Sequence, residues 1–248
     1  MTVDLNCDLG EGAGQDEVLM PLLTSANIAC GAHAGDEATM RATVALAQKH
    51  GVAIGAHPGF ADRENFGRRE LALPPDEVSE LVAVQVRRLR GIAREAGGEV
   101  THVKLHGALY NLASRDPVLA AGIVETVGRM EWRPTLFALA GSVLDRLARE
   151  RGDLRVCSEV FADRTYERDG TLTPRARAGA VMADEEAALA QVLRMVRAGV
   201  VRATDGSDVA IRAETICVHG DNPRAAAFAR RLRKELAAAG VALKASRA

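Results

Sequence analysis

The chain has 248 residues, of which 48% are hydrophobic and 26% charged, a composition typical of a globular protein with a substantial core. Its 32 Lys and Arg residues nearly balance its 33 Asp and Glu residues, so the net charge is −1. This balance argues against nucleic acid or an anionic membrane as the main partner. No apolar run reaches membrane-spanning length and the N-terminus lacks a signal-peptide pattern, so we expect a cytoplasmic protein.

Short apolar runs alternate with longer amphipathic segments along most of the chain. In chain order, the predicted strands are residues 3–9, 26–30, 52–57, 100–106, 135–140, 155–162 and 215–220, with a further short run at 241–245. Helix start and stop signals separate them. The predicted helices run from Asp36 to Gly51, from Pro75 to Gly97, onward from Asp116, from Asp184 to Gly199, and from Asn222 to Gly240.

Repeated strand-then-helix units of this length predict parallel strands joined by crossover helices. Seven or eight such units can close as a barrel or form an open doubly wound sheet. No linker or low-complexity tract divides the chain, so we expect one α/β domain over residues 1–248. Two connections, residues 58–74 and 163–183, are too long for plain turns, and long loops after strands are often functional.

Polar side chains gather at the ends of the predicted strands. The segment VKLHG places Lys104 and His106 on one face, because successive strand side chains point to opposite sides. In β/α barrels and open α/β sheets the active site lies at the C-terminal ends of the strands. A single Asp or His there is often a helix cap or a buried core group. The prediction of a functional site therefore depends on the number of such residues that gather at the strand ends. The strand-end residues expected to share one pocket are Asn6, Asp8, Glu11, Asn27, His33, His57, Lys104, His106, Glu159, Arg164, His219 and Asp221.

Several familiar site motifs are missing from the sequence. Residues 10–15 read GEGAGQ and not G-x-G-x-x-G, and the sequence has no P-loop, HExxH or G-x-S-x-G motif. The four cysteines form no CxxC pair and are expected to be small buried hydrophobes. The candidate functional groups at the strand ends are therefore mainly carboxylates, imidazoles and the lysine Lys104. Such a set suits hydrolysis of a small polar substrate. Asp8, His33 and His57 could ligate a divalent metal, but their spacing fits no fixed template, so metal content stays open.

Six segments of the chain resemble the LamB/YcsF family. They are VDLNCDLGEG, SANIACGAHAGD, GAHPGF, VKLHGALYN, SEVFADRTYERDGTL and CVHGDNP, and they span nearly the whole chain in the family's order. The resemblance implies a seven-stranded (β/α) barrel of the type shared with glycoside hydrolases and polysaccharide deacetylases. It also implies the role of the A subunit in a three-component 5-oxoprolinase, which opens 5-oxoproline to glutamate. Subunits B and C are expected to activate the lactam, with ATP as the co-substrate of the complex.

The chemistry of lactam opening suggests roles for five of the strand-end residues. A lactam is a poor electrophile, and phosphorylation of its carbonyl oxygen would create a reactive anionic intermediate. We expect Lys104 to stabilise the developing negative charge. Asp8, with Glu11 in reserve, is expected to activate water, and His57 or His106 to pass a proton to the leaving nitrogen.

The other strand-end residues are expected to bind the substrate. Arg164 and Tyr166 lie on the long loop after the sixth strand and could clamp the substrate carboxylate. The remaining members of the substrate-binding set are Asn6, Asn27, His33, Glu159, His219 and Asp221.

Two further hypotheses use the same residues. The chain could be a stand-alone metal-dependent deacetylase or amidohydrolase, with Asp8, His33 and His57 as metal ligands. It could also be a non-catalytic subunit that holds the activated intermediate for its partners.

Overall fold

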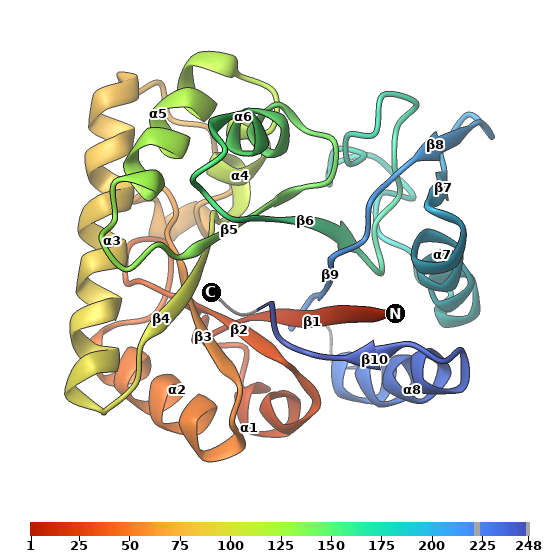
Figure 1. The fold of residues 1–248 in the computed structure, drawn as a ribbon, viewed down its shortest axis with the longest axis horizontal. Coiled ribbons are helices and arrows are strands. Elements are labelled where there is room, and N and C mark those ends of the chain that lie inside the picture. Colours follow the sequence, from red (N-terminus) through yellow and green to blue (C-terminus); the bar gives the residue numbers. More distant parts are fainter. Residues whose placement is uncertain (221–223, 247–248) are drawn as a thin grey trace.

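The computed structural model describes residues 1–220 and 224–246. Within this part of the chain, seven parallel strands pair in order, and the last returns to the first, so the sheet closes as a barrel (Figure 1). The predicted seven-stranded α/β barrel is therefore confirmed. The barrel strands are β1 (Thr2–Leu9), β2 (Ser25–Ala29), β3 (Ala53–His57), β4 (Val100–Lys104), β5 (Thr135–Leu139), β6 (Val156–Phe161) and β9 (Thr215–Val218).

The predicted eighth strand is a short addition to the ring. β10 (Ala242–Leu243) pairs in parallel with β1 at Thr2 and Val3. From Asp4 onward, β1 pairs instead with β9, and this pairing closes the barrel. β10 therefore extends the sheet at the N-terminal end of β1 without entering the ring.

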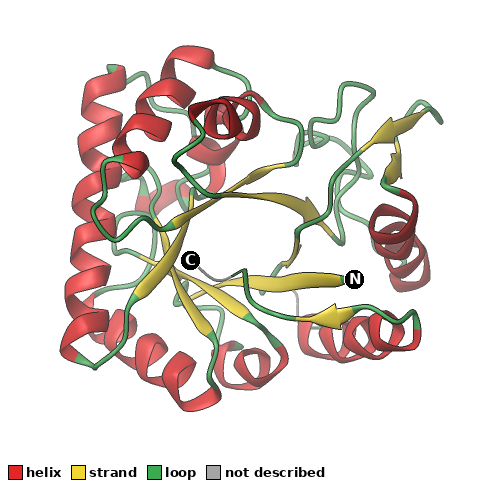
Figure 2. Ribbon diagram, in the orientation of Figure 1, coloured by secondary structure: helices red, strands yellow, loops and turns green. Residues whose placement is uncertain are grey.

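Helices surround the barrel (Figures 1 and 2). Side chains of Asp36, Asp116 and Asp184 accept hydrogen bonds from backbone N–H groups at three helix starts, as the sequence predicts. The predicted start at residues 222–223 lies outside the described residues. None of the helices in the described ranges has both the length and the apolar character needed to cross a membrane. The helices are α1 (Asp16–Leu19), α2 (Glu37–His50), α3 (Pro75–Glu95), α4 (Gly107–Ala113), α5 (Pro117–Gly128), α6 (Val143–Arg151), α7 (Glu185–Ala198) and α8 (Ala225–Ala238), with single 3₁₀ turns at Met20–Leu22 and Arg63–Asn65.

A two-stranded hairpin lies between α7 and β9, outside the barrel. Its antiparallel strands are β7 (Val200–Arg202) and β8 (Asp208–Ala210), and Figure 1 shows them beside α7. The long 163–183 segment is tied to this hairpin by a bridge from Tyr166 to Ala203. The hairpin was not among the elements predicted from the sequence.

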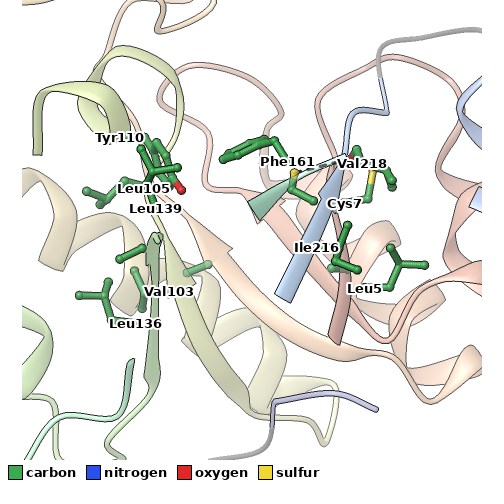
Figure 3. Close-up of a cluster of buried hydrophobic side chains, with 14 of the residues drawn as sticks. Leu5, Cys7, Val103, Leu105, Tyr110, Leu136, Leu139, Phe161, Ile216 and Val218 are labelled. Carbon is green, nitrogen blue, oxygen red and sulfur yellow. Dashed lines mark hydrogen bonds between the residues drawn. The ribbon is translucent and has the colours of Figure 1, made fainter. Parts of the chain in front are cut away.

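Strand side chains alternate between the helix layer and the barrel interior. Figure 3 shows apolar members of the outer layer, with Leu5 beside Ile216 and Val103 beside Leu136. The interior positions are largely polar instead. Fully or almost fully buried polar side chains inside the ring are Asp4, Asn6, Ser25, Asn27, His102, Lys104, Glu159 and Thr215. Because buried polar groups need partners, this interior must be a hydrogen-bonded network.

A glycine on β3 makes room for one member of this network. A Cβ atom at Gly55 would lie 2.0 Å from His102 Nε2. Without it, His102 Nε2 reaches Asn27 Oδ1 at 2.9 Å, and the ring stacks on Phe137 with centroids 4.3 Å apart. Burial, and then the charge of Lys104, lowers the pKa of His102 to about 3, so this imidazole is neutral. His102 is therefore a core residue.

Candidate functional site

Lys104, the last residue of β4, lies at the centre of the buried polar group. Its ammonium is 2.8 Å from Asp8 Oδ1 and 3.0 Å from Glu159 Oε1. It also contacts Asn6 Oδ1 at 3.3 Å and Cys217 Sγ at 3.0 Å, and the side chain is 2% exposed. Burial by itself lowers the pKa of Lys104, but the Asp8 carboxylate outweighs it, and the pKa lies well above its ordinary value. Lys104 is therefore a buried cation between two carboxylates.

Asp8 connects this cation to the mouth of the barrel. Asp8 Oδ1 accepts hydrogen bonds from Lys104 and from Asn27 Nδ2, both at 2.8 Å, while Oδ2 lies 3.3 Å from His57 Nε2. Burial alone would raise the pKa of Asp8, but His57 and Lys104 hold it well below its ordinary range. The Asp8 side chain is 14% exposed, whereas Lys104 is almost completely covered. Asp8 thus presents an ionised carboxylate at the open end of the site.

Three residues expected to bind substrate lie beneath Asp8 instead. Asn6 donates from Nδ2 to Glu159 Oε1 at 3.0 Å and to Thr215 Oγ1 at 2.7 Å. Asn27 donates to Asn6 Oδ1 at 2.7 Å as well as to Asp8. All of these side chains are fully buried because they occupy inward positions below the strand ends. In the structure Asn6, Asn27 and Glu159 therefore support Asp8 and Lys104, and their contact with substrate stays a prediction.

A second group at the mouth, the Glu–histidine cluster, consists of Glu11, His33, His57 and His106. Each comes from the end of a different barrel strand or the loop after it. Glu11 Oε1 lies 3.1 Å from His33 Nε2, 3.1 Å from His106 Nδ1 and 3.7 Å from His57 Nε2. His57 Nε2 and His106 Nδ1 are 3.0 Å apart, and the rings of His33 and His106 are stacked 3.7 Å apart. One potential ligand atom from each of the four residues lies within 4.8 Å of all the others.

Backbone carbonyls fix two of the imidazoles in this cluster. His57 Nδ1 lies 2.8 Å from the Lys104 carbonyl, and His106 Nε2 lies 2.8 Å from the Phe66 carbonyl. A carbonyl oxygen can only accept, so these two nitrogens carry the hydrogens. The other nitrogen of each ring therefore faces Glu11.

The donor types in the cluster suit a divalent metal ion. Burial alone would lower the pKa of His57, but the Asp8 carboxylate raises it above its ordinary value, so a proton and a metal ion compete for this ring. Burial lowers the pKa of His33 to about 4, so this imidazole is neutral at physiological pH. Burial alone would raise the pKa of Glu11, but hydrogen bonds from His106 and His33 lower it to about 2. Neutral imidazoles and an ionised carboxylate are common ligands of zinc and related metals. Of the hypothesised metal ligands Asp8, His33 and His57, the structure places His33 and His57 in this cluster with Glu11 and His106, while Lys104 and Asn27 contact Asp8 Oδ1.

Arg164 and Tyr166, which were expected to clamp a substrate carboxylate, bond to backbone groups of the chain in the structure. The Arg164 guanidinium donates to the carbonyls of Ala180 and Thr173 at 3.1 and 2.5 Å. The Tyr166 hydroxyl accepts a hydrogen bond from Phe161 N at 2.7 Å and is fully buried. Both side chains hold the 163–183 segment in shape, because its irregular backbone has no sheet or helix to satisfy it.

His219 and Lys104 contact the same aromatic ring, that of Phe161. Its Nδ1 is 2.7 Å from Asp163 Oδ1, and its ring stacks on Phe161 with centroids 5.6 Å apart. Phe161 in turn lies 5.3 Å from Lys104 Nζ. His219 and Asp163 line a separate cavity between α7 and α8. Asp221, the last predicted substrate-binding residue, lies outside the described residues.

Sequence reasoning missed two residues of the site. Cys217 Sγ contacts Lys104, and Cys217 shares the inward face of β9 with Thr215. The two residues are two positions apart, and this strand alternation could have predicted that Cys217 points into the barrel. The buried Tyr110 on α4 lies beside Glu159, and burial and that carboxylate raise its pKa well above the ordinary value. Tyr110 follows the strand by several residues, and no pattern in the sequence directs its hydroxyl inward.

Comparisons with known proteins agree with this architecture. The LamB/YcsF family matches residues 3–248. The 5-oxoprolinase A subunit of Geobacillus kaustophilus is 51% identical over 251 residues, which cover 99% of this chain and 97% of that protein. The crystal structure of a lactam utilization protein from Thermus thermophilus is 45% identical with a TM-score of 0.91, covering 99% of this chain and 100% of that one. A family 4 carbohydrate esterase from Streptomyces lividans, at 12% identity and a TM-score of 0.50 over 98% of this chain and 91% of that one, shares the fold alone.

The family match extends over almost the entire chain and includes every strand end that carries the site. The segments VKLHG and GAHPG, on which the resemblance rested, hold Lys104, His106 and His57 in the structure. The names of the similar proteins connect them to lactam use. The chain belongs to the LamB/YcsF family.

Proposed function

We propose that this chain is the A subunit of an ATP-dependent 5-oxoprolinase and that it performs the hydrolytic opening of the lactam ring. Partner subunits B and C would activate 5-oxoproline with ATP before this step. The observation that carries the proposal is the 51% identity, over nearly full length, to a protein named as the A subunit of 5-oxoprolinase. The ionised groups at the mouth of the barrel support a hydrolytic role.

Ring opening places three demands on the site. A water must be oriented and lose a proton, negative charge developing at the carbonyl must be stabilised, and the ring nitrogen must gain a proton as it leaves. Asp8 and Glu11 are the members of the site that meet solvent, with 14% and 11% of their side chains exposed. Substrate would therefore meet these two carboxylates first.

Asp8 is the group that we assign to the water. Its Oδ1 is held by Lys104 and Asn27, so Oδ2 is the oxygen directed toward the mouth beside His57. A carboxylate with a strongly lowered pKa is a weak base, and it can deprotonate water productively only when the electrophile is reactive. This property fits a lactam that has already been activated, and it fits an unactivated lactam poorly.

Lys104 acts in this proposal as a positioning residue. The sequence suggested that its ammonium stabilises the developing charge, but Asp8, Glu159 and Asn6 already contact it. Its role is to keep Asp8 ionised and correctly oriented. The proton that Asp8 takes from the water would then pass to the ring nitrogen as it leaves.

The proposal is tested by an omission series that measures glutamate release from 5-oxoproline. The complete mixture holds this chain, ATP and the two partner subunits, and each component is left out in turn. The proposal predicts glutamate only in the complete mixture. The corresponding G. kaustophilus protein, added in place of this chain, shows whether the partners are active.

Two outcomes would overturn the proposal. Glutamate release by this chain without ATP or partners would indicate a stand-alone amidohydrolase. No release with partners that are active beside the G. kaustophilus protein would show that this chain does not serve that reaction.

A further inference from the structure

We propose that Glu11, His33, His57 and His106 bind one divalent transition-metal ion, and that Zn²⁺ is the best match among common metals. The site lies at the mouth of the barrel next to Asp8. The inference concerns metal binding by the chain itself, and it holds or fails independently of the reaction proposed above.

Four of the distances between donor atoms are close to those that a shared ion would impose, and all the donor atoms lie within 4.8 Å of one another. Ligand atoms about 2.0–2.2 Å from zinc in a tetrahedral site lie roughly 3.3–3.6 Å from one another. Glu11 Oε1 lies 3.1 Å from the facing nitrogens of His33 and His106 and 3.7 Å from that of His57, while the nitrogens of His57 and His106 are 3.0 Å apart.

The hydrogen-bond pattern also favours a cation. His57 Nδ1 and His106 Nε2 donate to backbone carbonyls, so the facing nitrogens His57 Nε2 and His106 Nδ1 both carry lone pairs in the neutral rings. Glu11 Oε1 and Asp8 Oδ2 add negatively charged oxygens around His57 Nε2. One proton on His57 Nε2 can point at only one of these acceptors, whereas a metal ion can satisfy His57, His106 and Glu11 together.

The surroundings hold the donor atoms in place. Metal-bound histidines usually donate their other ring N–H to a carbonyl or carboxylate, and the Lys104 and Phe66 carbonyls take that position here. The loop over the cluster approaches closely at Gly67, where a Cβ would lie 2.8 Å from His33 Cβ and 3.0 Å from His106 Cδ2. Backbone contacts therefore hold the donor atoms in this arrangement, with Glu11 at its exposed edge.

The donor types select the class of metal. Three imidazole nitrogens and one carboxylate favour Zn²⁺, Co²⁺ or Ni²⁺ over Mg²⁺ and Ca²⁺, which prefer oxygen ligands. When bound, such an ion supplies Lewis-acid polarisation of a water or carbonyl oxygen. Asp8, held by Lys104, would remain beside it as the carboxylate that orients water.

The test is metal binding by the purified full-length chain. The chain is stripped with a chelator, titrated with Zn²⁺ in a calorimeter and analysed for bound metal after dialysis. We expect one Zn²⁺ per chain, a higher melting temperature in its presence, and a visible absorption spectrum of tetrahedral Co²⁺ after substitution. Weak or absent binding with no change in melting temperature would overturn the proposal.

Variants show whether the bound ion is at this site. Glu11→Gln and His106→Gln should each weaken Zn²⁺ binding by at least about 100-fold and abolish the Co²⁺ spectrum. His50→Gln, at the exposed end of α2, is the matched control and should bind as the unmodified chain does. Glu11 is partly exposed, so Glu11→Gln keeps the test valid even if His106→Gln fails to fold. Unchanged binding in a folded Glu11→Gln chain would place the metal elsewhere and contradict the inference.

Discussion

Replacement of Lys104 by Met tests the buried ion network at the centre of the site. The substitution keeps most of the side-chain volume but removes the ammonium that lies within 3.0 Å of both Asp8 and Glu159. These two carboxylates would then face each other inside the barrel without a cation. Glu159 is fully buried, so water cannot replace the lost partner there.

The expected loss of stability follows from this geometry. Removing one partner of a buried ion pair costs about 3–5 kcal/mol, because the charge left behind stays buried and unpaired. For a chain of this size, each kcal/mol lowers the melting temperature by roughly 2–4 °C, so we expect a decrease of about 10 °C. A typical total stability of about 5–15 kcal/mol leaves most of the variant folded at 25 °C.

Urea unfolding and thermal melting measure this effect. Lys49→Met is the matched control, because Lys49 is exposed in the last turn of α2, and its change should stay within about 0.5 kcal/mol. Adding Glu159→Gln to Lys104→Met removes the second buried charge and should recover part of the loss. Equal stability of Lys104→Met and Lys49→Met would refute the reasoning.

Turnover provides a second, independent measurement on the same variant. Lys104 and His57 hold the pKa of Asp8 low, so removing Lys104 should raise that pKa. Asp8 would then be protonated at higher pH, and the acidic limb of the rate profile should move to higher pH along with a loss of rate. A purely structural role for Lys104 would lower stability without moving this limb.

Three further predictions test the surroundings of the site. In chelator-treated protein, the pKa of Glu11 is about 2 against an ordinary 4.5, so its ionised form contributes about 3 kcal/mol of stability. This contribution is present above pH 4.5 and is lost as the pH falls toward 2. Glu11→Gln should therefore make the free energy of unfolding depend less on pH between pH 4.5 and 2. Gly55→Ala should cost about 1–3 kcal/mol in urea unfolding, since the new Cβ would lie 2.0 Å from His102 Nε2, and unchanged stability would contradict the packing described. Arg164→Gln should loosen the 163–183 segment and speed tryptic cleavage at the exposed Arg177, and unaltered digestion would show that the guanidinium does not hold the loop.

The barrel could be predicted from the sequence because its signals are local. Apolar runs of strand length alternate with capped helices, and the caps at Asp36, Asp116 and Asp184 lie where the sequence places them. α6 and the β7–β8 hairpin were missed although local signals exist for both. Ser142 caps α6, and Asp205-Gly206 is a typical hairpin turn.

The depth of each side chain could not be predicted in the same way. The alternation on β1 correctly directs Asn6 and Asp8 inward, but it does not say which of them reaches the mouth. Depth depends on the stagger between strands, which pairs Asp8 with Asn27 on β2. The partners of Arg164 could not be predicted for a related reason, because they are backbone carbonyls of a loop whose path no sequence pattern specifies.

The central claim, that this pocket carries ring opening, is tested most directly by glutamate formation with Asp8→Asn in the complete mixture of ATP and partner subunits. Asp205→Asn, in the exposed hairpin turn, serves as the matched control, and circular dichroism confirms that both variants are folded. The account predicts that Asp8→Asn lowers the rate by about 100-fold or more while Asp205→Asn keeps it. A folded Asp8→Asn chain that forms glutamate at the unmodified rate would contradict the account.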